Sequence, residues 1–83
     1  MDNQSMTNNE KLGLIFRQVF GLDSVSDAIT RSDMPEWNSM QTINLIMAME
    51  EAFNVEITPE DAAKMLSIGL IKEMLREKGV EMQ

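Results

Sequence analysis

The sequence predicts an all-α protein, a four-helix bundle with a long first loop and a short third helix. Apolar residues recur at helical spacing in three segments, and helix-capping patterns precede these segments. The apolar residues are mainly Leu, Ile, Val and Met, with three Phe, one Trp and no Tyr, which favours helices over a β sandwich. Since 83 residues are too few for two hydrophobic cores, we expect a single domain over 1–83, with flexible ends at 1–6 and 80–83.

The first helix is predicted to begin in the stretch Thr7–Glu10. This stretch has the capping-box pattern, in which the Thr hydroxyl and the Glu carboxylate satisfy backbone amides at a helix start. Gly21 is expected to end the helix, because glycine tolerates the left-handed conformation found there. The residues at i, i+3, i+4, i+7 and i+8 that form its buried face are Leu12, Ile15, Phe16, Val19 and Phe20.

The segment 22–37 has no sustained period and contains several Ser residues and a Pro, so it is predicted to be a long loop. We expect one turn of helix near Val25–Ile29. The second helix is predicted over Ser39–Phe53, with Asn38 as its cap. Its core face is expected to consist of Thr42, Leu45, Ile46, Met49 and Phe53.

Two further helices follow. The stretch Thr58–Asp61 has a capping hydroxyl, then Pro at the first helical position and acidic residues in the first turn, and it predicts a short helix that ends near Met65. Ser67 is placed to cap a fourth helix, and Gly79 to end it. The residues of the fourth helix predicted to face inward are Ile68, Ile71, Met74 and Leu75.

The charge of −7 is concentrated in the middle of the chain. Nine acidic residues and one basic residue lie between Asp23 and Asp61, which gives this segment −8, whereas the rest of the chain carries +1. Nucleic acid and anionic membranes are therefore unfavourable partners, and basic protein surfaces are favourable ones. The alternative is that the acidity only keeps the protein soluble. With no Cys, no membrane-spanning run and no signal-peptide pattern at the N-terminus, we expect a cytoplasmic protein.

The residues that most enzymes and metal sites need are missing. There is no His or Cys, and Ser39 lacks the G-x-S-x-G pattern of a hydrolase, so we expect no catalytic residues and no enzyme. The stretch Asp23–Ala28 fails as a calcium loop, because it has Val at the third position and Ala at the sixth. We therefore expect no metal site.

The predicted second helix is apolar on two sides. Besides its core face, Met40, Ile43 and Met47 form a second stripe at i, i+3 and i+7. This stripe either contacts a partner or fills gaps in the core, which Met does readily. Ser39, at the helix start, is either a simple cap or a place where the helix dipole would favour an attached phosphate.

The stretch Trp37–Ile57 resembles the acyl carrier protein family, and the resemblance extends from Leu12 to about Lys78. Members have an Asp-Ser-Leu motif that opens the second helix, followed by an apolar run, a Glu-Glu pair, Phe and a short segment ending in Ile. The resemblance implies a bundle of acyl-carrier type and a 4'-phosphopantetheine arm, which a phosphopantetheinyl transferase would attach to Ser39. The residues it implies for binding partner enzymes are Met40, Ile43, Met47, Glu50, Glu51 and Glu56.

The chain departs from the family pattern in two places. Asn38 stands where Asp is usual, and Gln41 and Asn44 stand where carriers for general fatty acid synthesis have acids. We therefore predict a specialised, monomeric carrier of a secondary biosynthetic pathway, served by acyl-loading and acyl-processing enzymes with basic docking surfaces. An unmodified helical interaction module, and a peptidyl or aryl carrier for nonribosomal assembly, are the alternatives. Trp37 is expected to pack on the bundle rather than to contact the arm.

Overall fold

The computed structural model describes residues 6–22 and 25–82, and within these ranges it is all-α, without strands. This confirms the predicted fold class. None of its helices combines the length and the apolar character that crossing a bilayer requires. The elements are α1 (Asn8–Phe20), the 3-10 helix η1 (Arg31–Asp33), α2 (Ser39–Phe53), α3 (Pro59–Ala63) and α4 (Ile68–Glu77).

The first helix begins and ends as its sequence predicts. The Thr7 hydroxyl accepts a hydrogen bond from the Glu10 backbone N–H at 3.1 Å, and the Glu10 carboxylate accepts one from the Thr7 backbone N–H at 2.9 Å. Gly21 adopts a left-handed conformation with φ of 71°, and its N–H donates to the carbonyl of Arg17. A capping box and a left-handed glycine therefore define α1.

The third helix ends at Ala63, two residues before the predicted end. The N–H groups of Lys64 and Met65 donate to carbonyls only three residues back, so the last turn tightens. The Ser67 hydroxyl then accepts from the N–H of Leu70 at 3.1 Å and caps α4. Gly79 follows α4 with φ of 92°.

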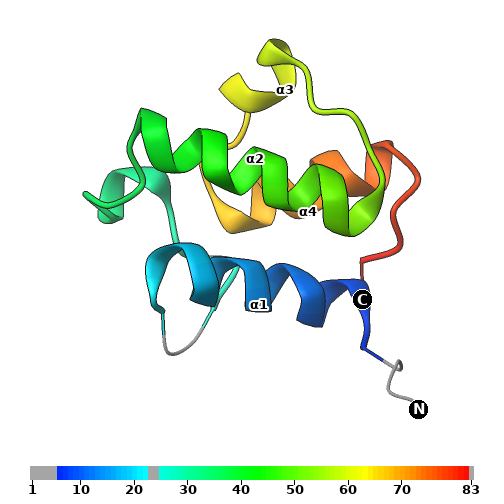
Figure 1. Ribbon diagram of the computed structural model, residues 1–83, viewed down its shortest axis with the longest axis horizontal. Helices are drawn as coiled ribbons and strands as arrows, with labels where there is room; N and C mark the ends of the chain where they lie inside the picture. Colours follow the sequence, from blue (N-terminus) through cyan, green and yellow to red (C-terminus); the bar gives the residue numbers. More distant parts are fainter. Residues whose placement is uncertain (1–5, 23–24, 83) are drawn as a thin grey trace.

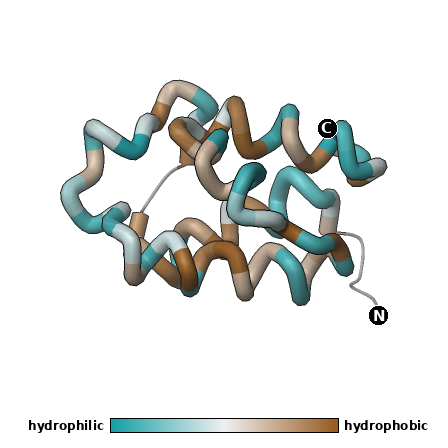
Figure 2. The backbone as a smooth tube through the Cα atoms, turned by 90° about the horizontal axis from the view of Figure 1, so that it is seen from above, coloured by the Kyte–Doolittle hydropathy of each residue, from teal (hydrophilic) through white to brown (hydrophobic). Residues whose placement is uncertain are grey.

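The helices enclose one core. In Figure 1, α1 runs antiparallel to α2, α4 lies behind α2, and the short α3 crosses at the top. Apolar and polar residues alternate along the helices (Figure 2), and the predicted core faces supply most of the buried side chains. The buried apolar residues are Leu12, Ile15, Phe16, Met34, Trp37, Leu45, Met49, Phe53, Ile57, Met65, Ile68, Ile71, Met74, Leu75 and Met82.

The helical structure of the long loop lies in a different place from the predicted turn of helix near Val25–Ile29. Between Ser26 and Ile29 there is a single hydrogen-bonded turn, and the short helix is instead at Arg31–Asp33. On either side of Thr30 the backbone pairs with the junction before α4: Arg31 N–H donates to Leu66 at 2.8 Å. The N–H of Ile68 donates to Ile29 at 3.0 Å. These pairings hold the loop against the segment that joins α3 to α4.

The last described residues, which belong to the end predicted to be flexible (80–83), contact the bundle. The Val80 N–H donates to Leu75, the Asn8 side chain donates to the carbonyl of Glu81 at 3.0 Å, and Met82 is buried. The chain thus returns from α4 to the start of α1. In the rest of the predicted flexible ends, residues 1–5 and 83 lie outside the described residues, and Met6 is exposed.

The Asp61 carboxylate joins α3 to the end of α4, and this contact makes stability depend on pH. Its Oδ2 lies 2.7 Å from Lys78 Nζ and accepts hydrogen bonds from the backbone N–H and hydroxyl of Thr58. The ion pair with Lys78, followed by the bonds from Thr58, lowers the pKa of Asp61 from 3.8 to about 2. A lowered pKa in the folded state stabilises the fold above pH 3.8, and this contribution disappears as the pH falls towards 2.

We therefore expect Asp61→Asn to unfold at lower denaturant concentration than the parent at pH 6, and the difference to shrink between pH 4 and pH 2. Glu60→Gln, which removes one charge from the same turn at an exposed position, serves as the control. Urea unfolding at several pH values and an NMR titration of the Asp61 carboxyl measure both effects. Titration of Asp61 near 3.8 in the folded protein would contradict the assignment.

Candidate functional site

Ser39 is the first residue of α2, and its side chain is exposed. The capping of this helix is done by its neighbour: the Asn38 side-chain oxygen accepts a hydrogen bond from the N–H of Gln41 at 3.0 Å. The Asn38 carbonyl also accepts from the Thr42 hydroxyl at 2.8 Å. Because Asn38 supplies the cap, the Ser39 hydroxyl is not required for it and faces solvent at the positive end of the helix dipole.

Trp37 anchors the chain just before this site. Its side chain is 2% exposed, its ring meets Phe16 nearly edge-on at a centroid distance of 5.4 Å, and it lies 5.8 Å from the ring of Phe20. The carbonyl of Trp37 accepts a hydrogen bond from Arg31 Nε at 3.2 Å. Trp37 therefore packs on the bundle, as the sequence predicts, and holds the start of α2 against the end of α1.

One polar atom of this anchor is unsatisfied. The indole N–H of Trp37 is buried and has no hydrogen-bond partner among the residues that the structure describes. A buried donor without a partner costs about 1–3 kcal/mol of stability. The indole N–H of a buried Trp usually donates a hydrogen bond, so the lack of an acceptor at Trp37 requires an explanation.

Two amide side chains early in α2, those of Gln41 and Asn44, form a clasp to α1. The Gln41 side-chain N–H donates to the carbonyl of Val19 at 3.4 Å, and the Asn44 side-chain N–H donates to the Gln41 oxygen at 2.7 Å. A carboxylate at position 41 could not donate to a carbonyl. This role of Gln41 was missed from the sequence, because its partner is 22 residues away.

The second apolar stripe of α2 lies at the surface. Met40 is 74% exposed, Ile43 58% and Met47 61%, whereas Thr42, Leu45 and Met49 of the same helix are buried. The three exposed residues thus do not fill gaps in the core. We call them the α2 stripe. Contact between this stripe and a partner stays a prediction.

The three glutamates predicted to bind partners have different surroundings. Glu50 is half-buried, and its carboxylate accepts a hydrogen bond from the N–H of Ile57 at 2.9 Å, which closes the loop after α2. Glu51 is exposed and lines a hollow between α2 and α1, together with Lys11. Glu56 is exposed in the loop before α3. The structure therefore places Glu51 on α2 beside the stripe, gives Glu50 an internal bond, and leaves Glu56 off the helix.

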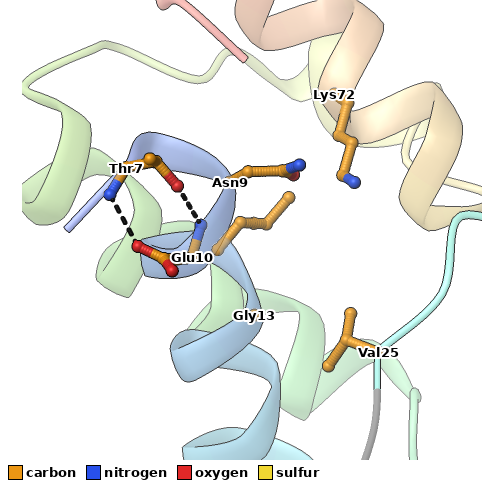
Figure 3. A pocket seen from close by; sticks show the side chains of 7 residues that line it. Thr7, Asn9, Glu10, Gly13, Val25 and Lys72 are labelled. Carbon is orange, nitrogen blue, oxygen red and sulfur yellow. Dashed lines mark hydrogen bonds between the residues drawn. The ribbon is translucent and has the colours of Figure 1, made fainter. Parts of the chain in front are cut away.

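A hollow of about 360 Å³ lies at the opposite end of α1 from the aromatic cluster. Figure 3 shows its walls: Asn9 and Lys72 reach towards the same space from α1 and α4, Val25 closes one side, and Gly13 leaves room on the helix surface. The capping hydrogen bonds between Thr7 and Glu10 stand at its rim. Ser39 does not line this hollow.

Metal ligands are not gathered anywhere in 6–22 and 25–82: these residues contain no cluster of three or more His, Cys, Asp or Glu side chains that could hold an ion. The stretch that fails as a calcium loop begins with Asp23 and Ser24, and both lie outside the described residues. Asp23 is also one of the nine acidic residues of the middle segment, so its surroundings are not described either.

Comparison with known proteins agrees with the geometry. No protein-family model matches the chain. The chain is 41% identical over 61 residues to an acyl carrier protein from Guillardia theta, an alignment that covers 70% of this chain and 73% of that protein. It is 32% identical over 68 residues to an acyl carrier protein from Desulforapulum autotrophicum, covering 78% and 87%. With such identity over most of its length, the chain belongs to the acyl carrier protein family and has the role of a carrier.

Proposed function

We propose that residues 1–83 form one carrier domain that holds 4'-phosphopantetheine on Ser39 and passes thioester-bound acyl intermediates between partner enzymes. The observation that carries the proposal is an exposed serine at the first position of a 15-residue helix whose cap is supplied by Asn38. The Ser39 hydroxyl is accessible to a modifying enzyme. Its use as a nucleophile leaves the capping hydrogen bond of α2 in place.

Attachment would be a phosphoryl transfer carried out by a phosphopantetheinyl transferase. The Ser39 oxygen attacks the phosphorus that bears the pantetheine of coenzyme A, a P–O bond breaks, 3',5'-ADP leaves, and the hydroxyl proton passes to a base of the transferase. The new phosphodiester keeps one negative charge, which the N-terminal end of α2 stabilises. When bound, the arm supplies a thiol that carries the acyl group as a thioester.

Partner enzymes would recognise the surface beside the arm. The α2 stripe supplies the apolar contact, and Glu51 and Glu56 supply exposed negative charge for basic residues around an enzyme's entrance. Glu50 adds charge to the same surface while one of its oxygens holds the loop. The partners would be acyl-loading and acyl-processing enzymes of the cytoplasm, and the protein would act as a monomer.

The clasp between α2 and α1 supports a specialised carrier of a secondary pathway. The side chain of Asn44 donates a hydrogen bond to that of Gln41, which in turn donates to the carbonyl of Val19. This part of α2 therefore presents neutral amides rather than acids to a partner. An enzyme whose basic residues are placed to pair with acids at positions 41 and 44 would form no ion pair with this chain. The two amides would therefore lower the affinity for such enzymes relative to others.

The arm on Ser39 can be tested by mass spectrometry. After incubation with coenzyme A and a promiscuous phosphopantetheinyl transferase, we expect the intact mass of the protein to rise by one phosphopantetheine. Ser39→Ala should show no addition, whereas Ser32→Ala, at another exposed serine, should be modified as the parent is. Addition to Ser39→Ala would show that the wrong serine was chosen, and no addition to the parent would favour the unmodified interaction module.

Asn38 should matter for folding through its cap and for modification through its charge. We expect Asn38→Ala to lower the free energy of unfolding by about 1 kcal/mol, because the N–H of Gln41 loses its acceptor. Asn38→Asp keeps that acceptor and should be as stable as the parent, while its carboxylate raises the rate of arm attachment. Urea unfolding and the transferase reaction rate measure the two effects; equal stability of the Ala variant and the parent would contradict the capping role.

The α2 stripe should contribute to the affinity of the transferase. We expect Ile43→Ser and Met47→Ser each to lower kcat/KM for arm attachment roughly fivefold to tenfold, since truncating an interface residue of this kind costs about 1–1.4 kcal/mol. Leu70→Ser, an exposed apolar residue on α4, is the matched control and should have little effect. Equal losses for the stripe variants and the Leu70 variant would exclude the stripe as the docking surface.

A further inference from the structure

The buried indole N–H of Trp37 lies two residues before Ser39 in the chain. Trp37 is otherwise fully satisfied: its backbone N–H donates to the carbonyl of Met34 at 2.9 Å, and its carbonyl accepts from Arg31 Nε at 3.2 Å. Only the indole N–H is left without a partner, in a side chain that is 2% exposed. A buried donor without a partner calls for an explanation, and an oxygen brought by a ligand would supply one.

Within the aromatic cluster of Phe16, Phe20 and Trp37, exposure is confined to Phe20. Phe16 is completely buried, but Phe20, at the end of α1, is only half-buried and its ring lies 5.8 Å from that of Trp37. Beside it, the carbonyl of Val19 is held to Gln41 by a bond of 3.4 Å, which is longer than the usual hydrogen bond of about 2.7–3.2 Å. Because Trp37 is 2% exposed, side chains around it must move before a ligand can reach the indole.

The core of the bundle can change shape. Five methionines are buried in this core as a whole, and Met side chains repack more easily than branched ones because they are unbranched and have three rotatable bonds. An apolar chain tethered at Ser39 gains free energy by leaving water for such an interior. The buried methionines are Met34, Met49, Met65, Met74 and Met82.

From these observations we infer that the Trp37 indole N–H binds a carbonyl oxygen of the group linked to Ser39. The oxygen is an amide of the arm, the thioester carbonyl, or a ketone of an oxygenated acyl chain. Where the bound oxygen is the ketone, Trp37 would select among cargoes, because an oxygenated chain satisfies the donor and a plain hydrocarbon leaves it unpaired. This inference rests on the proposed arm at Ser39.

The experiment uses the protein's single tryptophan, whose indole N–H gives one unambiguous NMR signal. Spectra are compared for the unmodified protein, the protein with the bare arm, and the protein loaded from octanoyl-coenzyme A and from 3-oxooctanoyl-coenzyme A. We expect the indole proton to move downfield and to exchange more slowly with solvent at the stage that brings the bound oxygen. The first stage that shows the change identifies the oxygen as arm amide, thioester carbonyl or ketone.

Trp37→Phe provides the second measurement, because it keeps an aromatic ring beside Phe16 and Phe20 but has no N–H. At the stage where the indole signal moves, loading should raise the Tm of the parent by more than that of Trp37→Phe. Intact mass is recorded for every sample, so a failure to load the arm, which would refute the proposed function, is distinguished from a failure of this inference.

An unchanged indole signal at all loaded stages would overturn the inference. In that case the N–H rests against the ring of Phe16, which meets the indole at 74° and at 5.4 Å, and needs no other partner. Equal Tm gains on loading for the parent and Trp37→Phe would overturn it as well.

Discussion

The pairing of the long loop with the junction between α3 and α4 is the constraint on which the site depends. The backbone of Arg31 bonds to Leu66, and that of Ile68 bonds to Ile29, so a loop whose one regular element is the short η1 is held at a fixed place. The Arg31 side chain then reaches the carbonyl of Trp37, and this sets where the chain turns into α2. Without this chain of contacts, the burial of Trp37 and the exposure of Ser39 would not be fixed relative to each other.

Neighbouring residues at the start of α2 have separate tasks. Trp37 is buried and supplies packing, Asn38 supplies the cap, and Ser39 is left accessible. The same separation runs along the helix, where Leu45 faces the core and Met47, two residues later, faces solvent. The proposed function needs this arrangement, because Ser39 and the α2 stripe must be reachable without any loss of packing in the small core of an 83-residue chain.

What the sequence could predict was mostly local. The capping patterns and the apolar spacing predicted α1, α2 and α4 to within a residue, because the residues that define those ends lie within one turn of each other. The predicted Ser39 and α2 stripe are exposed for the same reason: helical period alone separates them from the core face. The pattern Thr30-Arg31-Ser32-Asp33 contained a capping signal for η1 that could have been recognised, since the Thr30 hydroxyl accepts from the N–H of Asp33.

What could not be predicted depends on partners distant in sequence. Nothing near Glu50 indicates that it will bond to Ile57, and nothing near Gln41 indicates that it will bond to Val19.

The location of the lone tryptophan has a practical consequence. Because the chain has no tyrosine, the ultraviolet fluorescence of the unlabelled protein comes almost entirely from the cluster beneath the start of α2. The molecule thus contains its own optical probe, and any rearrangement between α1 and α2 during its working cycle can be followed without attaching a dye.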